Sequence, residues 1–533
     1  PAPAAERLGD RRSLELLSEL VAIAPTNLED LARDRFEKPN YRRAADAIVR
    51  AARANGLATR LFDPLETGDV ADDLRGLPRP NVIADLDVGA AETVLVMAHF
   101  DVVPVPTEQR SRWKSPPHSL TERADGRLYG RGANDDLGSG VVASLLALRR
   151  LADAGDAPRN VRLLACCDEE TGGEGGIEAL RAHDAKLPPG SPERFLTADV
   201  ALIPDGSPET TIGSSGLAFL EASFGGRVPL AETIAYGQAL VDLHELARGW
   251  KSAMPSPDWP SKGAPEPVIT GRATVTRFDV GGVAPASTVR LTAAHAETDA
   301  GNQVARSVTL VFEGPAAGLA GLAEGLRPLV PPPFVLEPTS VTSLVIPPGA
   351  VAVSVIGTAT HGGYPHRGHN PVPPALDLLR RAAADGAIDA RSTGAATFTV
   401  DLRFTPEMEL DDGLRQALGR VDGWIAAHAP SARIEAPPAR CRAGYALPAG
   451  HPAAVKLDRI LQATMGAHGF RGEYGGTDAS SLRGLTTPRG APLPALVFGS
   501  MDDAAHIHDA EESVDPTLLA GVAAAIERFV REP

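Results

Sequence analysis

The sequence predicts an α/β fold with a mainly parallel sheet, into which an α+β domain is inserted. Short apolar runs alternate with helix-like spacing before residue 206 and again after residue 450, and such alternation is typical of parallel sheets. Between these segments the pattern of apolar and polar residues changes, and proline-rich stretches such as 250–267 appear. The 533 residues are enough for two or more domains. We therefore expect one domain built from 1–206 and 437–533, closed around an insertion at 207–436.

Apolar spacing predicts the individual elements. In the first segment we expect helices over 14–23, 41–54 and 141–151, and strands over 81–84, 94–98, 161–165 and 200–203. In the insertion we expect strands over 216–224, 287–293, 307–312, 350–357, 396–404 and 432–435, and helices over 230–246, 317–329, 374–382 and 414–428. The last segment should hold helices over 452–468 and 516–531 and a strand over 495–498. The order of strands and helices repeats in the insertion, which predicts two related halves, 207–330 and 345–436. We expect the stretch 250–267 to be an excursion on the surface.

Composition and charge narrow the class of protein. The chain is 43% apolar and 23% charged, which is ordinary for a soluble globular protein. Its formal charge of −16 disfavours a nucleic-acid or anionic-membrane partner, and no apolar run is long enough to span a membrane. Cys166, Cys167 and Cys441 cannot form a disulfide framework, which favours free thiols in a reducing, cytoplasmic compartment. The first residues do not resemble a signal peptide, and a leader that has been removed is the alternative.

Metal-binding side chains recur at the ends of the predicted strands and after glycine-rich turns. Imidazole and carboxylate ligands suit zinc, and five of them exceed one closed tetrahedral site. They suit two metals that share a carboxylate and leave a position open for water. We assign Asp135 as the shared ligand, with His99 and Asp205 on one metal and Glu170 and His508 on the other.

Two neighbouring carboxylates are expected to support this site. Asp101 lies two residues after His99 and should accept the free imidazole N–H, which raises the basicity of the ligand. Glu169 precedes Glu170 and is the expected general base, which takes a proton from water and returns it to the leaving amine.

Each of these motifs alone has an ordinary explanation. A His-x-Asp is usually a surface pair, two adjacent glutamates are usually a solvated face, Asp205-Gly206 reads as a turn, and Asp135-Asp136 could cap a helix. Their joint occurrence at the ends of separate strands of one predicted sheet favours a metal site instead.

The motifs resemble, in order, those of the aminoacylase, carboxypeptidase G and carnosine-type dipeptidase family of two-zinc exopeptidases and deacylases (metallopeptidase family twenty). The matching segments are 98–104 (AHFDVVP), 128–138 (LYGRGANDDLG), 168–173 (DEETGG) and 203–206 (IPDG). The resemblance covers nearly the whole chain, more loosely in the insertion. It implies a zinc-exopeptidase catalytic domain with a lid of the dimerisation-domain type, and the metal roles given above.

The resemblance also selects the last metal ligand. Family members place this histidine four residues before a glutamate, and Glu512 fits that spacing with His508. His506 is the alternative.

Further site residues are implied in the insertion and just after it. His361 resembles the lid histidine that stabilises the developing oxyanion, and Arg403 resembles the arginine that clamps the substrate carboxylate. Asn370 matches the asparagine that follows the lid histidine, and Asn302 in the first half is a weaker candidate for the same polar contact. Gly476 and Thr477 resemble the glycine-rich substrate loop. The ordinary alternative is that His361 is a turn residue and Arg403 a surface charge.

Together these features predict a two-metal amidohydrolase that cleaves a dipeptide or N-acyl amino acid beside a free carboxylate. The metals are expected to be two Zn²⁺ ions, with Co²⁺ or Mn²⁺ as alternatives. A biosynthetic deacylase of the acetylornithine or succinyl-diaminopimelate type, and a non-catalytic metal-stabilised binding module, are the competing functions. The doubled lid carries one matching histidine, His361, which favours a monomer that completes its own site; a homodimer is the alternative.

Overall fold

The structure is a computed structural model. It describes residues 2–26, 40–67, 78–105, 107–258, 262, 264, 266–281, 288–298, 303–339, 344, 346–361 and 364–533, without the side chains of Thr107, Glu108, Asp135, His361 and Ala439. The chain divides into two compact units. Unit 1 comprises Pro1–Ile212, Ala446–Arg471 and Thr477–Pro533, and unit 2 comprises Gly213–Tyr445 and Gly472–Gly476. Unit 2 overlaps the predicted insertion and also takes up 472–476.

The sheet of unit 1 has a parallel centre with antiparallel strands at its sides. Its strand order is β1-β2-β6-β3-β7-β25-β8, with the bounds β1 Ala58–Phe62, β2 Asn81–Leu86, β6 Asn160–Cys166, β3 Thr93–His99, β7 Val200–Ile203, β25 Ala495–Val497 and β8 Thr210–Ser214. Strands β6, β3, β7 and β25 pair in parallel, whereas β1, β2 and β8 join antiparallel. The apolar run Val94–Ala98 of β3 is fully buried, as a central parallel strand requires. The predicted mainly parallel α/β fold is confirmed.

Helices from both ends of the chain pack in unit 1. They include α1 (Ala4–Leu8), α2 (Arg11–Ile23), α3 (Tyr41–Ala54), α6 (Ser144–Ala154), α7 (Ile177–Ala185), α14 (Pro452–Met465) and α15 (Pro516–Arg531). Helix α15 packs against α14 and against α6. Segments from before and after unit 2 in the sequence therefore pack together in unit 1. The first turn of α15 is capped by Asp515, whose side chain accepts the backbone N–H of Thr517.

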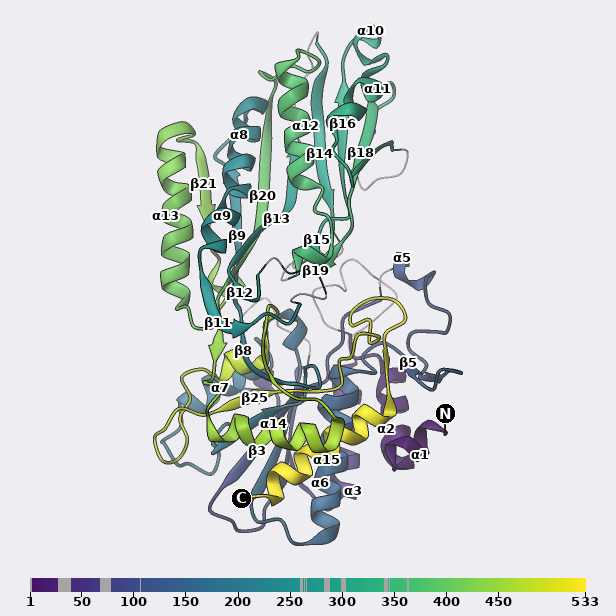
Figure 1. Cartoon of the computed structure of the whole chain (residues 1–533), viewed down its shortest axis with the longest axis vertical. Helices are drawn as coiled ribbons and strands as arrows, with labels where there is room; N and C mark the ends of the chain where they lie inside the picture. The colour runs from purple at the N-terminus through teal and green to yellow at the C-terminus, as the bar shows by residue number, and fades with distance from the viewer. Residues whose placement is uncertain are drawn as a thin grey trace. The chain divides into compact units, whose positions relative to one another are not determined.

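Unit 2 is built on an antiparallel sheet. Its order is β17-β18-β16-β14-β13-β20-β9-β21, with the bounds β17 Val335–Pro338, β18 Val351–Ile356, β16 Ser307–Glu313, β14 Arg290–Glu297, β13 Arg272–Gly281, β20 Thr393–Phe404, β9 Gly216–Phe224 and β21 Ala432–Glu435. Helices α8 (Leu230–Val241), α9 (Leu243–Arg248), α12 (Val372–Ala384) and α13 (Leu410–His428) run along these strands (Figure 1). Aliphatic and aromatic side chains between helices and sheet, such as Leu376, Phe398 and Val400, form its core.

Several elements differ from the sequence predictions. Trp250 and Asp258 are buried, and β11 (Lys251–Pro255) pairs with β12 (Val268–Thr270), so residues 250–258 of the predicted surface excursion are instead part of the folded unit. Strand β13 lies in the middle of the sheet of unit 2, although no strand was predicted there. The helix predicted at 317–329 is split into α10 (Ala316–Leu319) and α11 (Leu322–Leu326), because Gly321 adopts a left-handed φ of 76° between them.

Within the described ranges, no helix is both long enough and apolar enough to cross a membrane.

Candidate functional site

Three of the five predicted metal ligands lie where three adjacent parallel strands of unit 1 end. His99 is the last residue of β3, Glu169 and Glu170 follow β6, and Asp205 follows β7. Because β6, β3 and β7 are neighbours and run in the same direction, their carboxyl ends meet at one edge of the sheet. This topology brings side chains together that are far apart in the sequence.

The side chains form two groups that share one carboxylate. His99 Nε2 lies 3.5 Å from Asp136 Oδ1 and 3.7 Å from Asp205 Oδ2. His508 Nε2 lies 2.7 Å from Glu170 Oε1, and one ligand atom each of Asp136, Glu170 and His508 lies within 4.8 Å of the others. Asp136 therefore belongs to both groups. The side chain of Asp135, which was predicted as the shared ligand, lies outside the described part of the chain, so that assignment stays a prediction.

Asp101 contacts both His99 and the turn that carries the two glutamates. It is fully buried, and its carboxylate accepts the backbone N–H groups of Glu169 at 3.0 Å and Glu170 at 3.1 Å. His99 Nδ1 lies 3.1 Å from the Asp101 carbonyl oxygen and 3.4 Å from its Oδ1. With Nδ1 as the donor, Nε2 keeps its lone pair on the side of Asp136 and Asp205. Asp101 thus orients the imidazole and fixes the turn that carries both glutamates.

The electrostatics of the cluster favour a bound cation. Burial opposes the protonation of His99, but Asp136, Asp101, Asp205 and Glu169 together raise its pKa well above the ordinary value. Burial likewise opposes the ionisation of Glu170, but His508, with smaller effects of His99 and Arg131, outweighs it and lowers the pKa of that carboxyl. Carboxylates thus outnumber imidazoles in a buried space, and divalent cations relieve such an excess of negative charge. This set of nitrogen and oxygen donors fits zinc and related divalent ions.

The turn before Glu169 is held by a second buried ion pair. Asp168 adopts a left-handed φ of 63°, and its carboxylate pairs with Arg79; both side chains are 1% exposed. Burial raises the pKa of Asp168 to about 6, against the opposing effect of Arg79. Gly175 leaves the space that Arg79 fills, because a Cβ there would collide with both partners. The pair fixes the backbone from which Glu169 and Glu170 project.

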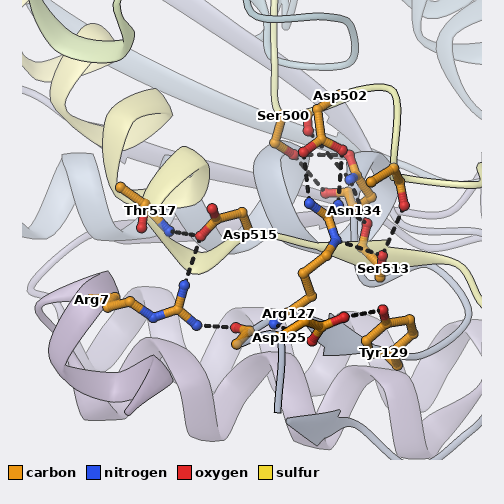
Figure 2. A network of polar contacts seen from close by, with 12 residues as sticks. Arg7, Asp125, Arg127, Tyr129, Asn134, Ser500, Asp502, Ser513, Asp515 and Thr517 are labelled. Carbon is orange, nitrogen blue, oxygen red and sulfur yellow. Dashed lines mark hydrogen bonds and ion pairs between the residues drawn. The ribbon is translucent and has the colours of Figure 1, made fainter. Parts of the chain in front are cut away.

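The segment that carries His508 is fastened by a network of polar contacts (Figure 2). The guanidinium of Arg127 donates to Asp502 at 2.6 and 2.8 Å and to the Ser513 hydroxyl at 2.9 Å. The Asn134 side chain donates to the Ser513 carbonyl oxygen at 2.8 Å, which joins the predicted metal motif to the same segment. His506 is exposed, whereas His508 reaches Glu170, so of the two candidate histidines the structure brings His508 to the cluster.

The site residues that the resemblance implies in the lid have different outcomes in the structure. The side chain of His361 and all of Asn302 lie outside the described residues, and their roles stay predictions. Asn370 donates to the Val275 carbonyl oxygen at 2.9 Å and accepts the backbone N–H of Val372 at 3.0 Å, which starts α12. These contacts give Asn370 a structural role.

Arg403 is not the surface charge of the ordinary alternative. It is 1% exposed and forms two hydrogen bonds with Asp401, at 2.6 and 2.9 Å. Its forked guanidinium, on which the predicted carboxylate clamp depends, is therefore engaged by a neighbouring residue. Gly476 belongs to unit 2 and Thr477 to unit 1, where Thr477 is buried at the start of a short helix, Asp478–Leu482.

Sequence reasoning missed several residues around the site. Asp136 lies next to Asp135 in the motif, and the spacing of the motif does not show which of the two aspartates contacts both ligand groups. Arg79 lies far from every motif in the sequence, and no sequence pattern near it indicates that it pairs with Asp168. Arg131 and Glu512 both lie in quoted motifs, but their pairing across the chain has no sequence pattern; both are buried, and Arg131 donates to Glu512.

Comparisons with known proteins identify the family of this chain. A model of peptidase family M20/M25/M40 matches residues 95–532. The chain is 26% identical to the cysteinylglycine-S-conjugate dipeptidase of Corynebacterium striatum over 466 residues, which cover 87% of this chain and 84% of that protein. Among solved structures, the di-peptidase Dug1p from Saccharomyces cerevisiae has a TM-score of 0.59 at 13% identity, covering 99% of this chain and 97% of its own. Human carnosine dipeptidase 1 has a TM-score of 0.56 at 14% identity, covering 98% and 96%.

At these identities the solved structures establish the fold alone. The family model, which covers most of the chain, confirms the resemblance that the motifs carried. The protein therefore belongs to peptidase family M20/M25/M40 and is a metal-dependent hydrolase.

Proposed function

We propose that this hydrolase cleaves the amide bond of a dipeptide, or of an N-acyl amino acid, next to a free carboxylate. The observation that carries the proposal is the cluster of imidazoles and carboxylates at the ends of β6, β3 and β7. Family membership and the dipeptidases among the relatives favour a small peptide as the substrate.

The proposal includes two divalent metals, most simply Zn²⁺. His99 and Asp205 would hold one, Glu170 and His508 the other, and a carboxylate of the Asp135-Asp136 pair would serve both. When bound, such ions lower the pKa of water to about 7 and polarise the scissile carbonyl group.

Glu169 is the proposed general base. Its backbone N–H is bound by Asp101, and its side chain is only partly buried, so water and substrate can reach it. Glu169 takes a proton from the attacking water and returns it to the nitrogen of the leaving amine. Glu170 is held by the same carboxylate of Asp101 and faces His508, so the two adjacent glutamates have different surroundings and different roles.

Two lid residues complete the proposal. His361 would donate a hydrogen bond to the oxygen that becomes negative, which is a large term in amide hydrolysis. Arg403 would bind the free carboxylate of the substrate, and that carboxylate has to compete with Asp401 for the guanidinium. We further infer that the chain works as a monomer, because the predicted doubled lid has one matching histidine, His361, with which the chain would complete its own site.

The substitution Glu169→Gln tests the base. It keeps the size of the side chain and should lower kcat by about 10²- to 10⁴-fold, because the amide cannot take up the proton. Metal content, measured by atomic emission, should equal that of the parent. Glu178→Gln is the matched control, since Glu178 lies on the following helix with a half-exposed side chain that pairs with Arg181, and its substitution should leave kcat unchanged. Turnover by Glu169→Gln within tenfold of the parent would show that Glu169 is not the base.

A substrate screen tests the reaction class. Dipeptides should be hydrolysed faster than N-acetyl, N-succinyl or carbamoyl amino acids when zinc, cobalt or manganese is supplied. Faster cleavage of an acyl amino acid would identify a deacylase instead. Stoichiometric metal binding without turnover of any of these compounds would support a binding module.

A further inference from the structure

A buried glutamine outside every motif contacts the backbone of His508. Gln109 lies in the short helix α5 (Thr107–Arg110) and is 6% exposed. Its Nε2 donates to the His508 carbonyl oxygen at 3.2 Å, and its Oε1 accepts from Arg131 Nη2 at 3.0 Å. Both ends of the amide are therefore occupied, which fixes its orientation.

Arg131 extends this connection to Glu512, four residues after the histidine. Its second terminal nitrogen donates to Glu512, and the two side chains are 0% and 1% exposed. The backbone N–H of Gly130 also donates to the Glu512 carbonyl oxygen at 3.1 Å. The chain from residue 508 to residue 512 is thus held at both ends by one buried arginine, directly at Glu512 and through Gln109 at His508.

The backbone of His508 needs such support. Its φ is 62°, in the left-handed region that residues other than glycine rarely adopt, and Glu511 has a φ of 69°. Strained conformations of this kind persist where the surroundings enforce them, and they concentrate at functional sites. The contact from Gln109 is made to the carbonyl group of the strained residue itself.

Other contacts fasten the same segment in a different way. Arg112 pairs with Asp509 and Arg123 with Glu511, but these contacts use the side chains of residues that follow the histidine. The Arg112–Asp509 pair is also exposed, with side-chain exposures of 55% and 50%. Gln109 differs because it is buried and reaches the peptide group that sets the direction of the imidazole.

We propose that Gln109 is a positioning residue that holds the His508 peptide group and thereby sets the affinity of the metal bound by Glu170 and His508. The inference rests on the proposed function, because it takes that ligand pair as given. Residues that orient metal ligands typically account for 10- to 100-fold in metal affinity or activity.

Cobalt titration of the metal-free full-length protein tests this proposal. Calorimetry gives the affinity of each equivalent, and the visible absorption of Co²⁺ reports the ligand geometry of each site. Gln109→Met fills the same space without either hydrogen bond. Gln109→Glu keeps an acceptor for Arg131 but cannot donate to the His508 carbonyl oxygen. Arg112→Gln is the control, because it removes an exposed contact to the same segment.

We expect both Gln109 variants to bind one equivalent of Co²⁺ about 10- to 100-fold more weakly and with an altered absorption spectrum, while the other equivalent keeps its affinity. Arg112→Gln should match the parent in both equivalents. Parent-like binding by Gln109→Glu overturns the proposal, even if Gln109→Met fails to fold. Equal weakening of both equivalents also overturns it, since that result indicates general loosening of the domain. A parent that binds no cobalt overturns the proposed function, and this inference with it.

Discussion

Replacing Arg131 with methionine should destabilise unit 1 by about 3–5 kcal/mol, because it removes one partner of a buried ion pair. Arg131 and Glu512 are 0% and 1% exposed, so water cannot solvate the carboxylate that remains. The substitution also removes the hydrogen bond from Arg131 to Gln109 at 3.0 Å. An exposed pair such as Arg112–Asp509 is worth only about 0–1 kcal/mol, so Arg112→Met provides the contrast.

Native-state hydrogen exchange followed by mass spectrometry is a suitable assay, because it measures the stability of each unit separately. Peptides from β3 and α15 report on unit 1, and peptides from β13 and β20 report on unit 2. The free energy of opening should fall by the stated amount in the first set and stay unchanged in the second.

The double variant Arg131→Met/Glu512→Leu completes the cycle. Removing both charges should recover most of the loss, since apolar residues often replace a buried ion pair without a net penalty. A loss below 1 kcal/mol in Arg131→Met, or an equal loss in the single and double variants, would refute this reasoning about the buried pair.

Two further predictions concern the shared ligand and a lysine. Asp135→Asn should lower the zinc content of the reconstituted protein while Asp136→Asn retains both equivalents, and the opposite outcome would assign the shared ligand to Asp136. Burial, with a smaller effect of Arg159, lowers the pKa of Lys456 from 10.5 to about 8. Between these values the folded protein binds fewer protons than the unfolded chain, so its stability should rise with pH relative to Lys456→Met. A difference in Tm between parent and variant that is constant from pH 8 to 10.5 would contradict this expectation.

Local sequence patterns were sufficient for most of unit 1. The apolar run ending at His99 predicted β3, and the run before Pro204 predicted β7, because buried parallel strands are continuous apolar segments bounded by polar turns. Once the strands were placed in one parallel sheet, their carboxyl ends had to be neighbours. The convergence of His99, Glu170 and Asp205 follows from that topology, with no knowledge of their distances.

The contacts that orient the ligands could not be predicted in this way. Arg79 and Asp168, like Arg131 and Glu512, meet across long stretches of chain, and neither partner has a local pattern that names the other. Strand β13 was missed for a different reason. The pairing register of β13 shifts between Val275 and Arg277. This shift breaks the simple alternation of apolar and polar residues that is expected of a strand.

The split construction of unit 1 has a consequence for how the protein matures. The ribosome delivers His99 and Asp205 before most of unit 2, whereas His508 and the strand β25 beside β7 emerge after it. During synthesis the nascent polypeptide therefore carries only part of the proposed ligand set, and unit 2 emerges before unit 1 can be completed. If these residues bind metal as proposed, metal capture has to wait until the polypeptide beyond unit 2 has been made and β25 has paired with β7.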